Sequence, residues 1–326
     1  MKTVVCTKYG PPEVLQLADV EKPAPKFNEV LIKIETTSVS VGDTRIRGFR
    51  VPLSFRLPAR LMLGITKPRH PVLGSVLAGT IESRGKDVTL FNPGDEVVAF
   101  TGHNFGAYAE YICMRETGCI TKKPGNLSFS EATAIPWGGY TSMHFLEQAA
   151  IKPGQRVLVY GASGSLGTAA IQLAKYAGAE VTGVCSTVNL KLVKSLGADR
   201  VIDYTTGDVF RNGEMYDVIY DTVGKSPVFK SMKALRKKGI LLHAVLMPMY
   251  GMFLKIIFKL NGRQLVGGTF TSNAIGLNRL NKLAEEGILR PVIDRTYPLE
   301  DIVEAHRYVD AGHKKGNLVI TINHSK

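Results

Sequence analysis

The sequence of 326 residues has few of the residues that mark disulfide-rich or metal-binding proteins. It has 4 cysteines and 7 histidines, and neither set shows the closely spaced pairs of a zinc site. The cysteines are Cys6, Cys113, Cys119 and Cys185. The sequence therefore predicts neither a disulfide framework nor a bound metal, and unpaired thiols are typical of a reduced, cytoplasmic protein.

Long apolar runs are also missing. Polar or helix-breaking residues interrupt the longest apolar stretch, 241–260, at His243, Pro248, Gly251, Lys255 and Lys259. A membrane-spanning helix needs about 20 consecutive apolar residues, so no transmembrane segment is expected. The first ten residues, MKTVVCTKYG, lack the apolar centre of a secretion signal and predict a strand.

No run of five basic residues occurs, although the formal net charge is +13. A positive excess attracts anions such as dinucleotides, nucleic acids and acidic membrane surfaces. Because no RNA-binding motif accompanies this charge, a solvated basic surface is the favoured interpretation. No nucleic-acid partner is expected.

The chain is long for one hydrophobic core, so two domains are expected. Residues 1–120 show short alternating strands separated by turns, which is typical of a β-barrel. After residue 128 the pattern changes to helices and then to alternating strands and helices, which indicates a doubly wound parallel sheet. The expected strands are 156–160, 180–185, 200–203, 217–221, 239–245, 264–270 and 318–322, and the expected helices include 166–177, 189–196, 227–237 and 273–286.

The stretch 157–181, VLVYGASGSLGTAAIQLAKYAGAEV, is the most informative one. A β-branched strand meets a glycine turn, which opens a helix and then a second strand, as in dinucleotide-binding βαβ units. Gly161 allows the tight turn, Gly164 leaves room for a pyrophosphate, and Gly167 lets the helix approach the sheet. The spacing is GxxGxxG rather than GxGxxG, but its place between strand and helix favours dinucleotide binding.

No carboxylate follows the second strand, where NAD-binding units place one for the ribose 2′-hydroxyl. The strand is followed instead by Ser186 and Thr187, and Lys191 is the nearest cation. Hydroxyl groups and a lysine accommodate a 2′-phosphate, so the sequence favours NADP(H) over NAD(H).

Several segments resemble the medium-chain dehydrogenase/reductase superfamily, and within it the zinc-free quinone oxidoreductases. The resemblance covers essentially the whole chain. It implies an α/β fold made of a GroES-like β-barrel catalytic domain and a Rossmann doubly wound cofactor domain. The implied domains are 1–122, 123–267 for the cofactor domain, and 268–326 for the return to the catalytic domain. The matching segments include SVSVGD (38–43), FNPGDEV (91–97), GAYAEY (106–111), DVIYDTVG (217–224) and GNLVI (316–320).

The same resemblance allows the zinc ligands to be compared one by one. Zinc-dependent relatives have a cysteine where this chain has Ser40 and Gly-His-Glu where it has Leu73-Gly74-Ser75, and the four-cysteine lobe is absent. We therefore expect no metal. Without a Lewis acid, hydride transfer to an acceptor that is already electrophilic, a quinone or an α,β-unsaturated carbonyl, is the expected reaction.

Family position also implies the site residues. Ser40 and Asp43 line the former metal position, and Asp43 either orients a proton donor or serves structurally by holding Arg47 or a turn. Trp137 and Tyr140 are expected to pack rather than react. The implied cofactor residues are Thr141, Gly161, Ser163, Gly164, Ser165, Leu166, Gly167, Ser186, Lys191, Tyr204, Val245, Thr269, Phe270 and Asn317.

Two other functions stay open at this point: an alcohol or aldehyde dehydrogenase, and a cofactor-binding protein without turnover that contacts RNA. A homodimer is expected, because the family usually pairs through the edge of the cofactor sheet. The apolar segment 247–259 is interpreted first as a buried helix or dimer contact. The alternatives are a lid over a lipophilic acceptor and a membrane contact through Lys255 and Lys259.

Overall fold

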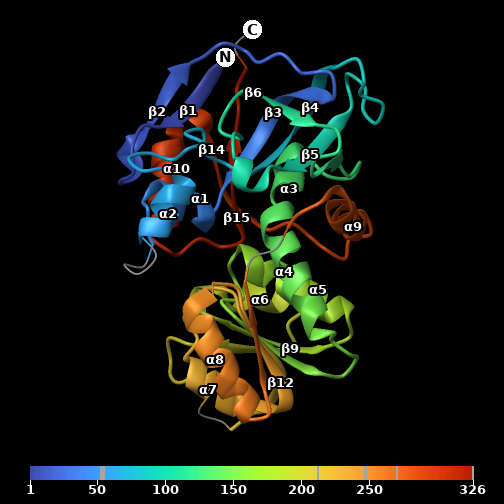
Figure 1. The fold of residues 1–326 in the computed structure, drawn as a ribbon. Helices are drawn as coiled ribbons and strands as arrows, with labels where there is room; N and C mark the ends of the chain where they lie inside the picture. Colours follow the sequence, from blue (N-terminus) through green and yellow to red (C-terminus); the bar gives the residue numbers. More distant parts are fainter. Residues whose placement is uncertain (52–55, 211–212, 246–247, 269–270, 325–326) are drawn as a thin grey trace. The chain divides into compact units, whose positions relative to one another are not determined.

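The computed structural model describes residues 1–51, 56–210, 213–245, 248–268 and 271–324 and divides the chain into two compact units (Figure 1). Unit 1 comprises Met1–Trp137, Ser272–Glu285 and Ile293–Lys326, and unit 2 comprises Gly138–Thr271 and Glu286–Val292. Within these described ranges, no helix has the length and apolar character needed to cross a membrane.

Unit 1 is built on a seven-stranded sheet with the order β14-β15-β3-β4-β5-β7, in which β6 also pairs with β3. All of its pairs are antiparallel except β14 with β15. The strands are β3 (Glu29–Val39), β4 (Val76–Arg84), β5 (Glu96–Phe100), β6 (Tyr111–Arg115), β7 (Ile120–Lys122), β14 (Ile293–Pro298) and β15 (Asn317–Thr321). A two-stranded sheet, β1 (Lys2–Cys6) with β2 (Leu15–Asp19), lies outside this order.

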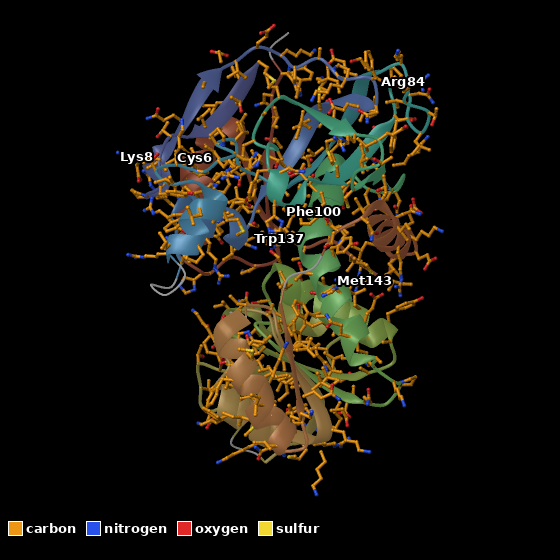
Figure 2. The ribbon with its side chains drawn as sticks, in the orientation of Figure 1. Cys6, Lys8, Arg84, Phe100, Trp137 and Met143 are labelled. Atoms are coloured by element: carbon orange, nitrogen blue, oxygen red, sulfur yellow. The ribbon has the colours of Figure 1, made fainter. Side chains whose placement is uncertain are left out.

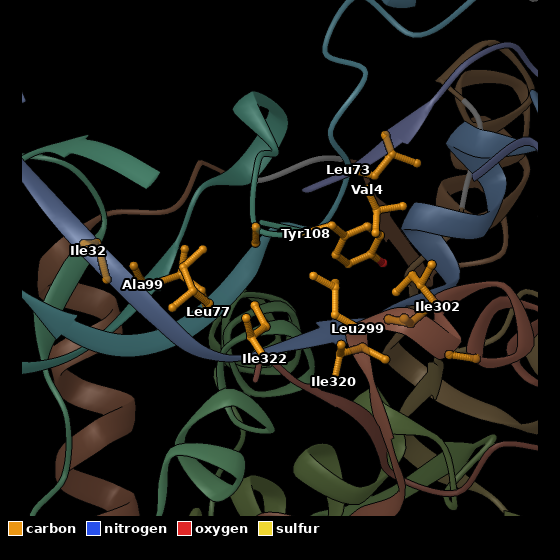
Figure 3. Packing of buried hydrophobic residues seen from close by; sticks show 14 of the residues in the cluster. Val4, Ile32, Leu73, Leu77, Ala99, Tyr108, Leu299, Ile302, Ile320 and Ile322 are labelled. Carbon is orange, nitrogen blue, oxygen red and sulfur yellow. The ribbon is translucent and has the colours of Figure 1, made fainter. Parts of the chain in front are cut away.

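Strand β3, which is buried along most of its length, contributes much of the core of unit 1. Val30, Ile32 and Ile34 are two residues apart, so their side chains share one face of the strand, and all three are fully buried. They belong to a cluster with Leu77 and Ile320 from neighbouring strands (Figure 3). The helices of unit 1 are α1 (Val41–Arg47), α2 (Arg56–Leu63), α3 (Phe129–Thr133), α9 (Ala274–Glu285) and α10 (Ile302–Asp310), with short turns η1 (Pro12–Val14), η3 (Gly102–Asn104) and η5 (Leu299–Asp301).

Unit 2 is a six-stranded, fully parallel sheet with the order β10-β9-β8-β11-β12-β13. The chain runs outward from β8 to β10 and then returns to place β11 beside β8. The carboxyl ends of β8 and β11 therefore form a topological switch point, where ligands bind in sheets of this kind. The strands are β8 (Arg156–Tyr160), β9 (Glu180–Cys185), β10 (Arg200–Asp203), β11 (Tyr216–Asp221), β12 (Leu235–His243) and β13 (Gln264–Gly267). The helices are α4 (Pro136–Ala149), which begins in unit 1, α5 (Ser165–Tyr176), α6 (Leu190–Ser195), α7 (Val228–Ala234) and α8 (Pro248–Leu260), with a turn η4 (Thr187–Asn189).

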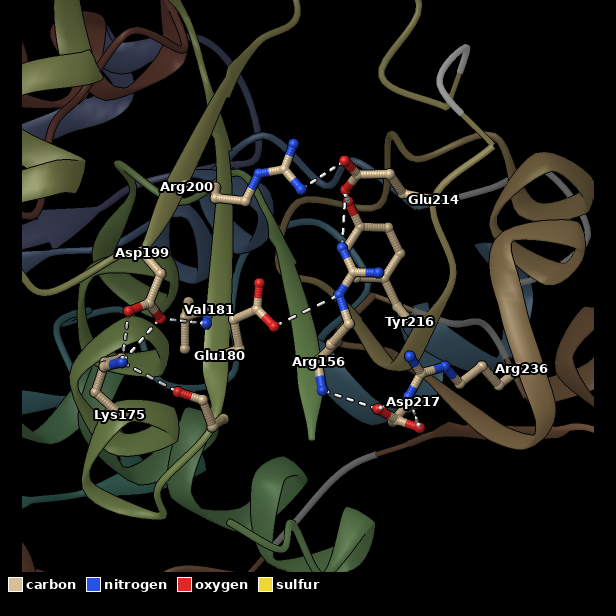
Figure 4. A network of polar contacts seen from close by, with 11 residues as sticks. Arg156, Lys175, Glu180, Val181, Asp199, Arg200, Glu214, Tyr216, Asp217 and Arg236 are labelled. Atoms are coloured by element: carbon tan, nitrogen blue, oxygen red, sulfur yellow. Dashed lines mark hydrogen bonds and ion pairs between the residues drawn. The ribbon is translucent and has the colours of Figure 1, made fainter. Parts of the chain in front are cut away.

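The amino edge of this sheet carries a network of ion pairs (Figure 4). Arg156, the first residue of β8, lies 3.7 Å from Glu180 and 3.1 Å from Glu214. Glu214 also pairs with Arg200 at 2.5 Å, and Asp217 pairs with Arg236 at 2.9 Å. These charges neutralise one another at one edge of the sheet, and the opposite, carboxyl edge carries the glycine turn.

The combination of a GroES-like domain and a Rossmann-like parallel sheet confirms the expected fold class. Strands β8, β9 and β10 have the predicted bounds. The helix expected to reach residue 237 ends at Ala234, and β12 begins at Leu235. The pairing of β12 with β11 shifts register between Leu235 and Ile240, and Lys238 within this stretch has a positive φ of 66°. No helix was predicted at 302–310, where the structure has α10. The buried face of α10 includes His306, a polar residue that interrupts the apolar pattern of a helix.

The compact units differ from the expected domains 1–122, 123–267 and 268–326 at three places. Unit 2 extends to Thr271 rather than ending at residue 267. Residues 123–137 lie in unit 1, because α3 packs on β3 and β4. Residues 286–292 lie in unit 2, because the side chain of Gln172 makes two hydrogen bonds to the backbone of Arg290. Short segments therefore belong to the unit whose strands or helices they contact rather than to that of their neighbours in the sequence.

The apolar segment predicted at 247–259 forms α8, and Met247 itself lies outside the described residues. Leu254 and Phe258 are buried against Leu158 and Leu241 of the sheet. The expectation of a buried helix holds for this inner face only, because Ile256 on the same helix is 57% exposed.

The two faces of α8 predict different effects of truncation. Phe258→Ala removes a fully buried ring and leaves a cavity, so we expect it to lower the free energy of unfolding by about 3–5 kcal/mol. The control Ile256→Ala removes an exposed side chain and should change it by less than about 0.5 kcal/mol. Urea titration followed by circular dichroism measures both, and equal effects would contradict the assigned faces.

Candidate active site

Two glycines of the turn between β8 and α5 are required by packing. Gly161 has a φ of +82°, and a Cβ there would lie 2.7 Å from the Thr222 hydroxyl oxygen. A Cβ on Gly167 would lie 2.2 Å from the carbonyl oxygen of Gly161. A side chain at Gly161 would clash with Thr222 and Val223, whereas one at Gly167 would force α5 away from the glycine turn.

Gly164 differs from the other two glycines. Its backbone is extended, with φ −80°, and a Cβ would meet only the Gly161 carbonyl oxygen at an ordinary 3.6 Å. It is the N-cap of α5, no side chain caps the helix there, and no acidic residue lies in its first turn. The amide groups and the positive end of the helix dipole are therefore suited to an anion, and the missing side chain lets the diphosphate of a dinucleotide come close.

Ser163 and Ser186, at the carboxyl ends of β8 and β9, are joined by a residue that the sequence analysis missed. The side-chain amide of Asn189 donates to the hydroxyl oxygens of Ser163 (3.2 Å) and Ser186 (3.1 Å). Since each hydroxyl accepts from Asn189, its own hydrogen is oriented elsewhere and is suited to donate to a phosphate oxygen. In the sequence, only the position of Asn189 three residues after Ser186 could have indicated that its side-chain amide reaches the Ser186 hydroxyl.

The structure corrects the expectation for Thr187. Its hydroxyl donates to Asp203 at 2.5 Å, and the hydrogen bonds from Thr187 and Thr205 lower the pKa of this carboxyl. Asp203 ends β10, and parallel pairing places it beside Cys185 at the end of β9. A carboxylate therefore does lie near the end of the second strand, because it comes from the neighbouring strand.

The remaining cofactor candidates of unit 2 lie around the same edge of the sheet. Tyr204, which follows β10, donates its backbone N–H to the carbonyl oxygen of Cys185 at 3.2 Å and keeps a half-exposed ring. Lys191 lies exposed on α6. The hydroxyl of Ser142 donates to the carbonyl oxygen of Leu166 at 2.8 Å, which ties α4, the helix of buried Thr141, to the first turn of α5.

Four candidates stand apart from this group. Val245 follows β12, where its backbone N–H donates to Nδ1 of His243 at 3.3 Å. Asn317 begins β15 and is buried in unit 1. Thr269 and Phe270 lie outside the described residues. Ser165 does not stand apart, since it begins α5 directly after Gly164.

Ser40 and Asp43, the residues at the former metal position, cap α1. The backbone N–H of Asp43 donates to the Ser40 hydroxyl oxygen at 3.2 Å, and the Ser40 N–H and hydroxyl donate to the Asp43 carboxylate at 2.7 and 2.6 Å. Burial raises the pKa of Asp43, while hydrogen bonds from Ser40 and the Gly74 amide oppose this rise. The pair thus forms a capping box, which fixes where α1 begins.

Asp43 does not hold Arg47, which has other partners. The fully buried guanidinium donates to Asp310 at 2.5 Å and to Nδ1 of His306 at 3.1 Å. Nε2 of His306 therefore carries the hydrogen and donates to the Tyr108 hydroxyl at 3.2 Å. Burial, followed by the charge of Arg47, lowers the pKa of His306 to about 3, so this ring is neutral.

No ligand set for a metal converges near these residues. In the part of the chain that the structure describes, no group of three or more His, Cys, Asp or Glu side chains is placed to hold an ion. Ser40 and Ser75 are both buried. Trp137 packs edge-to-face on Phe100, with ring centroids 6.0 Å apart, and fills the space beside Gly42 (Figure 2).

Comparison with known proteins supports one family over the whole chain. Residues 26–124 match the alcohol dehydrogenase GroES-like domain, and residues 196–320 match the zinc-binding dehydrogenase model. The chain is 33% identical to 2-methylene-furan-3-one reductase of Solanum lycopersicum, over 98% of this chain and 79% of the relative. It belongs to the medium-chain dehydrogenase/reductase superfamily, in the zinc-free quinone oxidoreductase branch.

Two further relatives agree with this membership. The NADPH-dependent alkenal/one oxidoreductase, chloroplastic, of Arabidopsis thaliana is 29% identical over 98% of this chain and 79% of its own length. The solved quinone oxidoreductase from Coxiella burnetii has a TM-score of 0.88 and 30% identity, over 99% of both chains. This member of the superfamily is therefore an oxidoreductase that uses NAD(P)H.

Because Gly164 is not required by packing, its replacement separates ligand binding from stability. We expect Gly164→Ala to keep the free energy of unfolding within about 0.5 kcal/mol, and to weaken NADPH binding by about tenfold or more as the Cβ displaces the diphosphate. Gly167→Ala should instead destabilise the protein by about 1–3 kcal/mol. Fluorescence titration and urea unfolding measure the two effects, and unchanged NADPH affinity in Gly164→Ala would contradict the assignment.

Proposed function

We propose that this enzyme transfers a hydride from NADPH to a quinone or an α,β-unsaturated carbonyl compound without a metal ion. The observation that carries the proposal is the side-chain chemistry at the former metal position. Ser40 there is held in a helix cap, and Ser75 replaces a ligand of the zinc-dependent relatives. A hydroxyl group provides no Lewis acid to lower the pKa of an alcohol, whereas a conjugated acceptor is already electrophilic.

The names of two relatives describe the same chemistry. Those of the tomato and Arabidopsis enzymes specify a methylene-furanone and alkenals or alkenones, all conjugated carbonyl compounds. When bound, the reduced nicotinamide supplies the hydride. The residues of this chain then have to bind the cofactor and place the acceptor beside it.

For the cofactor, we assign separate tasks to three groups. The turn at Gly164 and the first amides of α5 would hold the diphosphate. The hydroxyls of Ser163 and Ser186, oriented by Asn189, would donate to the 2′-phosphate, with Lys191 as the nearest cation. Thr141, Leu166, Tyr204, Val245 and Asn317 remain proposed contacts.

For the acceptor, we assign positioning roles to Ser40 and Asp43, because the Ser40 hydroxyl already donates to the Asp43 carboxylate and has no hydrogen left for a carbonyl oxygen. The hydrogen bonds of the capping box fix the direction of the Ser40 hydroxyl. No covalent enzyme intermediate is proposed, because burial raises the pKa of each of the cysteines to about 11 and keeps them as thiols at neutral pH.

The serine hydroxyls favour NADPH over NADH. The nearby Asp203 carboxylate reduces this preference, because its negative charge repels the 2′-phosphate. We expect NADPH to bind more tightly than NADH in fluorescence titrations. Ser186→Asp should reverse this preference, because two like charges would repel. Asp203→Asn should increase it by removing a negative charge close to Thr187. Equal affinities, or tighter NADH binding by the unmodified enzyme, would remove the argument for the 2′-phosphate.

The reaction can be tested with labelled cofactor. NADPH that carries deuterium at the transferred position should deliver the label to the β-carbon of an enone, because the conjugated carbon is the electrophilic one. The value of kcat/KM for enones should far exceed that for oxidation of simple alcohols, and removal of metal ions with a chelator should leave it unchanged. Label on the carbonyl carbon would instead indicate an alcohol or aldehyde dehydrogenase.

A homodimer and a cytoplasmic location also remain proposals. Strand β13 is an edge strand of the parallel sheet, and an exposed edge can pair with a second copy. The Arabidopsis relative is named chloroplastic, so location differs within the family. Sedimentation velocity and imaging of the tagged protein test the two proposals.

A further inference from the structure

The stretch 222–271 of unit 2 contains no Asp or Glu, but it contains seven lysines and two arginines. It forms α7, β12, α8 and β13. The amino edge of the same sheet, by contrast, balances its charges in ion pairs. This part of unit 2 is therefore suited to an anionic partner.

The outer face of α8 adds exposed apolar side chains to this charge. Met252, Phe253, Ile256 and Leu260 are 66%, 64%, 57% and 81% exposed. Met252, Ile256 and Leu260 follow one another at four-residue intervals and form a stripe along the helix. Large apolar side chains gathered on one face indicate an interaction surface rather than chance exposure. We call these four residues, with Lys255 and Lys259, the outer face of α8.

The two lysines beside this stripe differ from other cations of unit 2 in their ion pairing. Lys230 pairs with Asp208 and Arg236 with Asp217, whereas among the described residues no ion pair involves Lys255 or Lys259. The backbone of Lys238 lies close to the end of α8, since its N–H donates to the carbonyl oxygen of Gly262 at 2.7 Å.

Three kinds of partner can be compared on these grounds. A second copy that docked through the same face would bring Lys255 and Lys259 against their counterparts with no acidic residue to balance them. A nucleic acid would match the cations but leave four large apolar side chains unused. An acidic bilayer surface matches both, because apolar side chains enter the acyl boundary while lysines stay among the headgroups.

We propose that the outer face of α8 docks this protein on the surface of an anionic lipid bilayer. The apolar stripe inserts at the interface, and Lys255 and Lys259 contact acidic headgroups. This is peripheral binding, in which α8 lies along the membrane surface. It goes beyond the proposed function, because docking requires neither NADPH nor an acceptor.

The test is flotation of the full chain with two kinds of vesicle: phosphatidylcholine alone, and phosphatidylcholine mixed with phosphatidylserine. We expect binding to the mixed vesicles only, weakening as salt is raised. Lys255→Gln with Lys259→Gln should weaken it about 30-fold, at about 1 kcal/mol for each lysine. Phe253→Ser with Ile256→Ser should weaken it about tenfold or more while conserving charge.

Two matched controls make the same kinds of substitution at exposed positions outside α8. Lys26→Gln with Lys152→Gln removes two exposed lysines, and Leu90→Ser with Ile275→Ser removes two apolar side chains that are 61% and 83% exposed. Both controls should bind mixed vesicles like the unmodified protein. Urea unfolding of every variant verifies that the exchanged side chains leave unit 2 folded.

Four results would overturn the proposal. These are no flotation of the unmodified protein, equal flotation with phosphatidylcholine alone, full binding by the double lysine variant, and binding to an RNA homopolymer in place of vesicles. A change from dimer to monomer in Phe253→Ser with Ile256→Ser, without vesicle binding by the unmodified protein, would assign the face to self-association. Because no cofactor is present, these outcomes are independent of the test of hydride transfer.

Discussion

The close approach of α5 to the end of β8 is the constraint on which unit 2 depends. It exists because Gly167 has no side chain, since a Cβ there would lie 2.2 Å from the Gly161 carbonyl oxygen. The approach brings the positive end of α5 to the carboxyl edge of the parallel sheet. Ser163, Ser186 and Asn189 meet at the same edge, so the place where the helix dipole favours an anion is also the place where hydroxyl donors gather.

Charge is distributed very unevenly around unit 2, and each region has a different task. At the amino edge, Arg156, Glu180 and Glu214 neutralise one another. At the carboxyl edge, near-neutral hydroxyls and backbone amides are left for a bound dinucleotide, with Asp203 as the acidic exception. On the α8 side, lysines without acidic partners lie beside exposed apolar residues, which is why we infer an acidic lipid surface as the partner there.

In unit 1, the two residues expected at the former metal position are part of the scaffold. Ser40 and Asp43 cap α1, and the same helix ends at Arg47, whose buried charge is balanced by Asp310 on α10. Removing one member of a buried pair of this kind costs about 3–5 kcal/mol. The two ends of α1 are therefore both fixed, one by the capping box in which the Ser40 hydroxyl donates to Asp43 and the other by the pair of Arg47 with Asp310.

Local patterns were enough to predict the parallel sheet and the glycine turn with its helix, because strand alternation and glycine requirements are properties of short segments. The serines in place of metal ligands were predicted from the resemblance to a known family. The contacts of Asp203 with Thr187 and of Arg47 with Asp310 depend on which strands and helices become neighbours, and Arg47 and Asp310 are 263 residues apart. The sequence alone did not distinguish the two faces of α8 either. Both contain large apolar residues, and only packing against Leu158 and Leu241 identifies the buried face. Pairing between distant segments minimises exposed apolar area and unpaired charge over the whole molecule, and no single segment of the sequence contains that information.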